Sequence, residues 1–177
     1  MPDFDAKKTV TMTFRIEDEV LSQLRSESGK KEVSLNTLVN QVLRRFVEWD
    51  MYESKVGMIP IARPVVHMLF ENMGEDEIVE MACKVGKGAV HDIALFMKSK
   101  MDLESFLSWL ETRLKSSSME FSHSIKDDRH VYIIKHDLGR NWSLYHKAIL
   151  ELIFSEALDR RVNIAITDTT MSFAVDA

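Results

Sequence analysis

Apolar and polar residues alternate strictly over residues 9–16, close to the start of the chain. The apolar positions are Val10, Met12, Phe14 and Ile16, and the polar positions are Thr9, Thr11, Thr13 and Arg15. A period of two residues is typical of a strand with one apolar face and one polar face. Because this segment contains no sheet to join, the pattern predicts pairing with the same strand of a second copy of the chain.

Two amphipathic helical patterns follow this strand. Acidic residues 17–19 favour the positive end of a helix dipole, and the Gly-Lys-Lys stretch at 29–31 is a stop signal. Ser34 is expected to be the N-cap of the second helix. The apolar positions of that helix recur every three and four residues, and they are Leu35, Leu38, Val39, Val42, Leu43, Phe46 and Val47. The stripe is wide for a short helix, as expected if the helix is covered both by its own chain and by a partner.

The order of strand, helix, a Ser-x-Asn turn at 34–36 and second helix resembles the ribbon-helix-helix DNA-binding family, the fold of the Arc and MetJ repressors. The resemblance covers about residues 7–49. It implies an intertwined homodimer whose two-stranded ribbon inserts into the major groove of double-stranded DNA. The expected fold class is therefore α+β, with this unit first and a separate domain of helices and antiparallel strands behind it.

The resemblance also implies which residues contact DNA. Strand residues that point outwards contact bases, and the start of the second helix holds a phosphate. By position, the base contacts are Thr11, Thr13 and Arg15, and the phosphate contacts are Ser34, Asn36, Lys7 and Lys8. A guanidinium pairs bidentately with guanine, and a helix N-terminus attracts anions. The structural alternatives stay open, because threonine suits any solvated strand face and Ser34 would cap its helix without DNA.

The charge of the chain gives this interpretation qualified support. The whole sequence has 23 basic and 28 acidic residues, a net charge of −5. Residues 7–47 hold eight basic and five acidic residues, a local charge of +3, which leaves −8 for the remainder. Proteins that bind nucleic acid without sequence preference are usually basic, whereas this chain is acidic outside its mildly basic N-terminal unit. Specific base contacts with salt-sensitive binding are the expected combination.

Beyond this unit, periodicity predicts a second domain over residues 65–177, joined to residues 1–50 by a connecting segment over 51–64. Gly57, Pro60 and Pro64 interrupt helical patterning in that segment, although its apolar residues predict that it packs on one domain. Helices are predicted over 65–72, 76–85, 89–98, 103–115 and 142–158, and strands over 119–125, 130–136, 162–167 and 171–175. Asp102 is expected to cap the fourth helix. The simplest packing is an antiparallel sheet with the long helix across one face.

No enzyme, metal or cofactor is indicated by the remaining residues. Six histidines are present, but only His123 and His130 are expected to approach each other, across a hairpin, and two ligands do not make a metal site. Cys83 is the single cysteine, which excludes an intrachain disulfide, and it is expected to be buried in a helix. The Gly-Lys-Gly stretch at 86–88 is predicted to break a helix, without the spacing of a phosphate loop. The polar turn at 137–142 is interpreted as a helix entry capped by Asn141, with a ligand rim as the alternative.

The sequence has no apolar run long enough to cross a bilayer and no secretory segment at its start, so a cytoplasmic protein with no membrane partner is expected. Two functional hypotheses follow. In the first, the protein is a dimeric transcriptional regulator, more often a repressor in this family. Its second domain senses a small molecule or a protein, or joins two dimers into a tetramer on DNA. In the second, the N-terminal unit only dimerises, and the protein is an antitoxin-like or adaptor-like interaction module.

Overall fold

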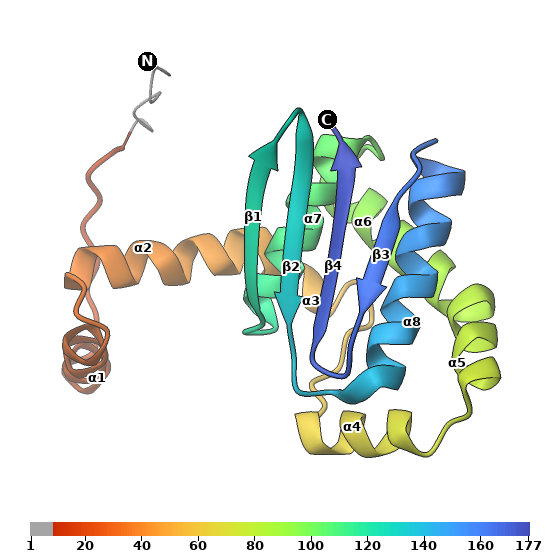
Figure 1. The fold of residues 1–177 in the computed structure, drawn as a ribbon. Coiled ribbons are helices and arrows are strands. Elements are labelled where there is room, and N and C mark those ends of the chain that lie inside the picture. The colour runs from red at the N-terminus through yellow and green to blue at the C-terminus, as the bar shows by residue number, and fades with distance from the viewer. Residues whose placement is uncertain (1–8) are drawn as a thin grey trace. The chain divides into compact units, whose positions relative to one another are not determined.

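The computed structural model describes residues 9–177, which divide into two compact units at the bond between Arg44 and Arg45 (Figure 1). Lys7 and Lys8, expected to contact the DNA backbone, lie outside the described residues. Within residues 9–177, no helix is long and apolar enough to cross a membrane.

The first unit contains two helices at the predicted positions. Helix α1 is Asp18–Lys30, and α2 is Leu35–Arg45, whose last residue belongs to the second unit. Ser34 caps α2 as expected, because its Oγ accepts a 3.0 Å hydrogen bond from the backbone N–H of Thr37. The strand predicted over residues 9–16 is not present in the single chain, where residues 9–17 are in neither helix nor strand. A strand needs a second strand to satisfy its backbone hydrogen bonds, and the ribbon predicted here takes that strand from another copy.

The second unit has the α+β composition expected from the sequence, with the predicted order of elements. Helices come first and are followed by a β-hairpin, a long helix and a second hairpin. Their bounds are η1 (Phe46–Asp50, π-helical), α3 (Met51–Glu53), α4 (Arg63–Glu71), α5 (Glu75–Met81), η2 (Ala82–Gly86, π-helical), α6 (Lys87–Lys98), α7 (Leu103–Ser116), β1 (Glu120–Lys126), β2 (Arg129–Lys135), α8 (Gly139–Leu152), η3 (Ile153–Ala157, π-helical), β3 (Asn163–Ile166) and β4 (Thr170–Asp176). Asp102 caps α7 through a 2.8 Å bond from the Ser105 N–H to its Oδ1.

The four strands form one antiparallel sheet in the order β1-β2-β4-β3. Asp127 and Asp128 connect β1 to β2 in a two-residue turn, and their φ angles of 49° and 56° are both in the left-handed region. This is the conformation of a type I′ turn, whose twist matches that of the flanking strands. The sheet order places β4 in the middle, between the first hairpin and β3.

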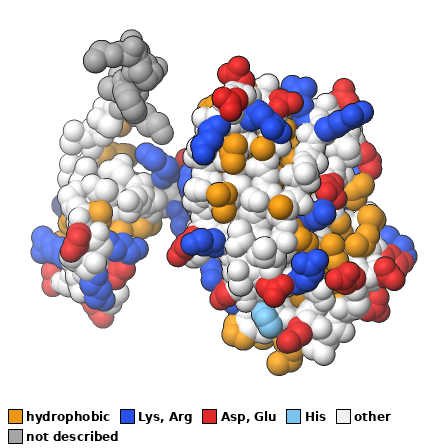
Figure 2. All heavy atoms as spheres, in the orientation of Figure 1, with side chains coloured by type: hydrophobic (Ala, Val, Ile, Leu, Met, Phe, Trp, Pro, Cys, Tyr) orange, Lys and Arg blue, Asp and Glu red, His pale blue; other side chains and the backbone are white. Residues whose placement is uncertain are grey.

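One face of the sheet packs against helices, and the buried residues of β2 and β4 alternate accordingly. Tyr132 and Phe173 are paired neighbours on this face, with ring centroids 5.1 Å apart. The contact continues through Phe154 of η3 to Phe106 of α7, at 5.6 Å and 5.7 Å. Figure 2 looks onto the opposite face of the sheet, where small and polar side chains predominate and hydrophobic ones are scattered. The core of the second unit therefore lies between a single sheet and the helices behind it.

The segment over 51–64, predicted to connect two domains, belongs to the second unit. Trp49, just before it, is buried and donates a 2.6 Å hydrogen bond from Nε1 to Glu53. Arg63 donates to the backbone carbonyls of Ser117 and Ser118, at 2.9 Å each. These contacts hold both ends of the segment on the unit that follows, as its apolar composition indicates.

Two expectations for residues 82–88 were wrong. The helix does not break at Gly86, because η2 continues directly into α6. The glycine is instead a close contact with α8: a Cβ there would lie 2.7 Å from the hydroxyl of Tyr145, and closer still to Ile149. Cys83 is exposed rather than buried, because the opposite side of the same turn packs inwards through Ala82 and Gly86.

This contact predicts opposite effects for two neighbouring glycines. Gly86→Ala is expected to lower the free energy of unfolding by about 1–3 kcal/mol, because the new methyl group overlaps a packed core side chain. Gly88→Ala meets nothing within 4 Å and is expected to be neutral or to stabilise by up to about 1 kcal/mol through helix propensity. Urea denaturation followed by circular dichroism measures both variants. Equal effects of the two substitutions would contradict the close contact.

Candidate functional site

The residues predicted to contact bases lie together on the surface of the first unit. Thr11, Thr13 and Arg15 are all exposed, and they alternate with apolar side chains that are exposed as well. Val10 has 84% of its surface accessible and Phe14 has 57%. Exposed large apolar side chains at every second position are unusual in a single chain, and contiguous apolar surface of this kind marks an interaction site.

The second helix of the ribbon-helix-helix pattern shows the same excess of exposed apolar surface. Leu38 is buried, whereas its apolar neighbours one and two turns along the helix are exposed, and they are Val42, Leu43, Phe46 and Val47. The stripe that the sequence predicts is therefore covered at its start and uncovered further along. Half-covered stripes of this kind are expected where a second chain supplies the remaining contacts.

The start of α2 has the features of an anion-binding helix terminus, although its side chains are already hydrogen-bonded. Ser34 Oγ lies 2.8 Å from Thr37 Oγ1, in addition to capping the helix. The carbonyl oxygen of Asn36 accepts a 2.8 Å bond from Asn40 Nδ2. No acidic residue occupies the first turn of α2, so the free N–H groups there face no local negative charge.

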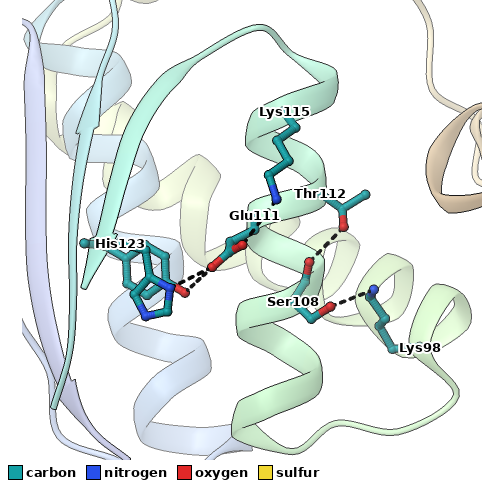
Figure 3. A network of polar contacts seen from close by, with 7 residues as sticks. Lys98, Ser108, Glu111, Thr112, Lys115 and His123 are labelled. Carbon is teal, nitrogen blue, oxygen red and sulfur yellow. Dashed lines mark hydrogen bonds and ion pairs between the residues drawn. The ribbon is translucent and has the colours of Figure 1, made fainter. Parts of the chain in front are cut away.

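In the second unit, His123 and His130 do meet across the β1–β2 hairpin, as expected from the sequence. Nε2 of His123 and Nδ1 of His130 are 2.9 Å apart. The other nitrogen of His123, Nδ1, lies 2.9 Å from Oε1 of Glu111 on α7, as Figure 3 shows. Tyr132 donates a 2.9 Å hydrogen bond to the same oxygen, and burial, with this bond, raises the pKa of its hydroxyl.

This carboxylate–histidine–histidine chain ends on an imidazole. The outer nitrogen of His123 faces a second imidazole, where a hydrolase would place a hydroxyl or thiol nucleophile. Lys115 lies 3.4 Å from the other oxygen of Glu111, and Ser108 accepts a 3.0 Å bond from Lys98 on the outer side of α7 (Figure 3). Among residues 9–177, no three His, Cys, Asp or Glu side chains gather in a metal-binding set. The cluster instead ties β1 to α7.

His136, directly after β2, is held in a buried hydrogen-bond chain that joins three parts of the unit. Ser143 of α8 donates a 2.9 Å bond to the carbonyl oxygen of Thr167, so its Oγ accepts from Nε2 of His136 at 2.7 Å. Nδ1 of His136 accepts a bond from the N–H of Leu138 at 3.2 Å. This chain needs a neutral imidazole, and desolvation by burial lowers the pKa of His136 accordingly.

His146 lies one helical turn after Trp142 on α8, and the two rings stack with centroids 3.8 Å apart. Its Nδ1 donates a 3.0 Å bond to the carbonyl oxygen of Trp142. Burial, with a smaller contribution from the nearby Arg113 cation, lowers the pKa of His146 to about 3. Both imidazoles are therefore neutral at physiological pH. Sequence reasoning gave no signal for this, because the main cause is burial, which depends on how the whole unit packs.

The polar turn at 137–142 leads into α8 as predicted, but the prediction that Asn141 caps this helix was wrong. The helix already begins at Gly139, whose φ of 80° requires a glycine. Asn141 lies inside α8, and its Nδ2 donates to the carbonyl oxygens of Phe70 and Met73, at 2.9 Å and 2.8 Å. It therefore satisfies carbonyls at the end of a different helix, α4, which local sequence does not reveal.

Comparison with known proteins identifies no relative. No protein-family model matches the chain, and no curated protein sequence matches it significantly. The functional interpretation rests on the residues and their geometry.

The neutral state of His146 predicts a pH-dependent stability. Its pKa in the folded protein lies below the unfolded value of about 6.5, so the unfolded chain binds the extra proton. The contribution of His146 to the free energy of unfolding is fully present above pH 6.5. It is lost as the pH falls below that value, by about 2 kcal/mol at pH 5.

Urea denaturation at pH 7.5 and 5.0 is expected to show this loss in the wild type and a smaller loss in His146→Gln. His67→Gln, on the exposed side of α4, is the matched control and should keep the wild-type loss. An unchanged pH dependence in His146→Gln would refute the assignment.

Proposed function

We propose that this protein is a homodimeric, sequence-specific DNA-binding regulator of the ribbon-helix-helix type, acting as a transcriptional repressor. The observation that carries the proposal is the alternation of exposed apolar and polar side chains over residues 9–16, directly before a pair of helices. The polar side holds the three side chains that would read bases, and the apolar side is what a second copy would cover.

The partner is a second copy of the same chain. An unpaired strand beside exposed apolar helix residues is an aggregation hazard unless another strand pairs with it. Pairing with the identical segment of a second copy forms a ribbon and brings two apolar faces into one core. A two-fold symmetric interface uses the same surface patch on both chains. The same residues therefore form both sides of the interface.

The polar face of such a ribbon matches the chemistry of the major groove. Two strands fit the groove width, and each copy would present two threonines and one arginine to base edges. Thr11 and Thr13 offer a hydroxyl and a methyl group, suited to thymine or to a base acceptor. The capped start of α2, which has no acidic residue in its first turn, would hold the adjacent phosphate.

Arg15→Ala tests base readout. The variant is expected to bind its operator about tenfold to hundredfold more weakly, because a bidentate contact to guanine is lost from each copy. The operator is first recovered by selecting bound fragments from a genomic duplex pool at two salt concentrations, and affinity is then measured by fluorescence anisotropy. Arg25→Ala removes the same charge from an exposed position on α1 and is the matched control. Recovery of no common motif, with the dimer intact, would favour the protein-interaction module.

Phe14→Asp tests the ribbon itself. Phe14 is 57% exposed in one chain, so a single-chain protein would tolerate aspartate there with little change. In a paired ribbon the carboxylate would be buried beside its twin, and the protein is expected to become monomeric and to lose DNA binding. Light scattering after size exclusion gives the mass, and Thr13→Asp, on the polar face, should remain dimeric. A dimeric Phe14→Asp protein would contradict the proposed pairing.

A further inference from the structure

The second unit contains a cavity of about 530 Å³ between α4, α7, α8 and the sheet. This volume is in the range of small-molecule binding pockets. The floor is made of buried apolar side chains, among them Leu110, Ile134 and Ile149. Ile59 and Ile61 also line the cavity and are exposed, so they mark the side that is open to solvent.

Arg113 lines this cavity without a counter-ion. It is partly buried, and desolvation lowers the pKa of its guanidinium. Within residues 9–177 it has no carboxylate within 4.0 Å. The guanidinium carbon instead lies 5.8 Å from the centre of the Trp109 ring. A partly buried cation without an anion is expensive unless something else supplies the negative charge.

Trp109 also lines the cavity, and the Arg113 cation faces its ring. Only 1% of the residue's surface is accessible, and its Nε1 atom has less than 1 Å² of accessible surface, so this N–H is closed off from the cavity. Trp109 therefore contributes its apolar ring to the cavity wall.

The other two arginines around the cavity are already paired. Arg45 lies 3.2 Å from Asp50, and Arg63 lies 3.4 Å from Asp137. The one acidic residue of the lining, Glu53, keeps its negative charge and accepts a hydrogen bond from Trp49. Among the described lining residues, Arg113 is therefore the arginine whose charge no carboxylate compensates.

From these observations we propose that the cavity binds an organic carboxylate with an apolar body. The guanidinium of Arg113 holds the carboxylate, and the apolar floor covers the body of the molecule. The assignment rests on the second unit alone and stands independently of DNA recognition by the first. It gives a chemical class to the small-molecule effector that a regulator would sense.

Titration of the full-length protein with two acids and their neutral counterparts tests the proposal. Octanoate and 3-phenylpropionate are compared with 1-octanol and 3-phenylpropanol, by calorimetry and by the fluorescence of Trp109 and Trp142. At least one acid is expected to bind, and Arg113→Met is expected to weaken its binding by tenfold or more while leaving the alcohols unaffected. Whether the chain or the ring binds more tightly distinguishes an aliphatic from an aromatic ligand, and either result supports the site.

Two further variants keep the test decisive. Arg129→Met removes an arginine that pairs with Asp176 outside the cavity, and it should bind the acids like the wild type. Arg113→Lys keeps a positive charge without the planar guanidinium fork, so it should weaken binding severalfold and tests the site if Arg113→Met fails to fold. The proposal is overturned if neither acid binds the wild type, or if the acids bind Arg113→Met or Arg113→Lys as tightly as they bind the wild type.

Discussion

The proposed dimer depends on apolar surface that a single chain leaves exposed. Val10, Met12, Phe14 and Ile16 stand exposed on one side of the N-terminal segment, and four large apolar residues of α2 and η1 are exposed as well. Burial of a large apolar side chain is worth about 1.5–3 kcal/mol, so covering both sets is the main favourable contribution to the proposed dimer. The proposed dimer and the DNA-reading ribbon follow from the same requirement.

The second unit is stabilised in a different way, by polar contacts that join elements distant in the sequence. His136, Ser143 and Thr167 connect β2, α8 and the last hairpin through bonds that require a neutral imidazole. Glu111 connects α7 to β1 and β2 through His123 and Tyr132. Every member of these chains that is buried has its partner, whereas Arg113 has no carboxylate within 4.0 Å among residues 9–177. A cation without a counter-ion in a cavity is therefore a more specific sign of a ligand than the cavity volume alone.

Local sequence predicted what local physics determines. The alternation of apolar residues, the cap at Ser34, the cap at Asp102 and the Asp127–Asp128 turn each depend on neighbours within a few positions, and the structure has both caps and the turn. Sequence reasoning failed where a side chain acts over a long range. Asn141 looked like a cap for its own helix and binds the end of α4 instead, and Gly86 looked like a break and is a contact with α8. Arg113 was missed for the same reason. Nothing near it in the sequence signals that no carboxylate will face its guanidinium.

Amide hydrogen exchange over residues 9–16 of the full-length protein tests the proposed ribbon most directly. In a two-stranded antiparallel ribbon each strand has one neighbour, so every second amide donates to the partner and the others face solvent. We therefore expect protection factors that alternate along this segment and that fall when the protein is diluted towards the dissociation constant of the dimer. Uniformly fast exchange at every amide of the segment, independent of protein concentration, would contradict the account.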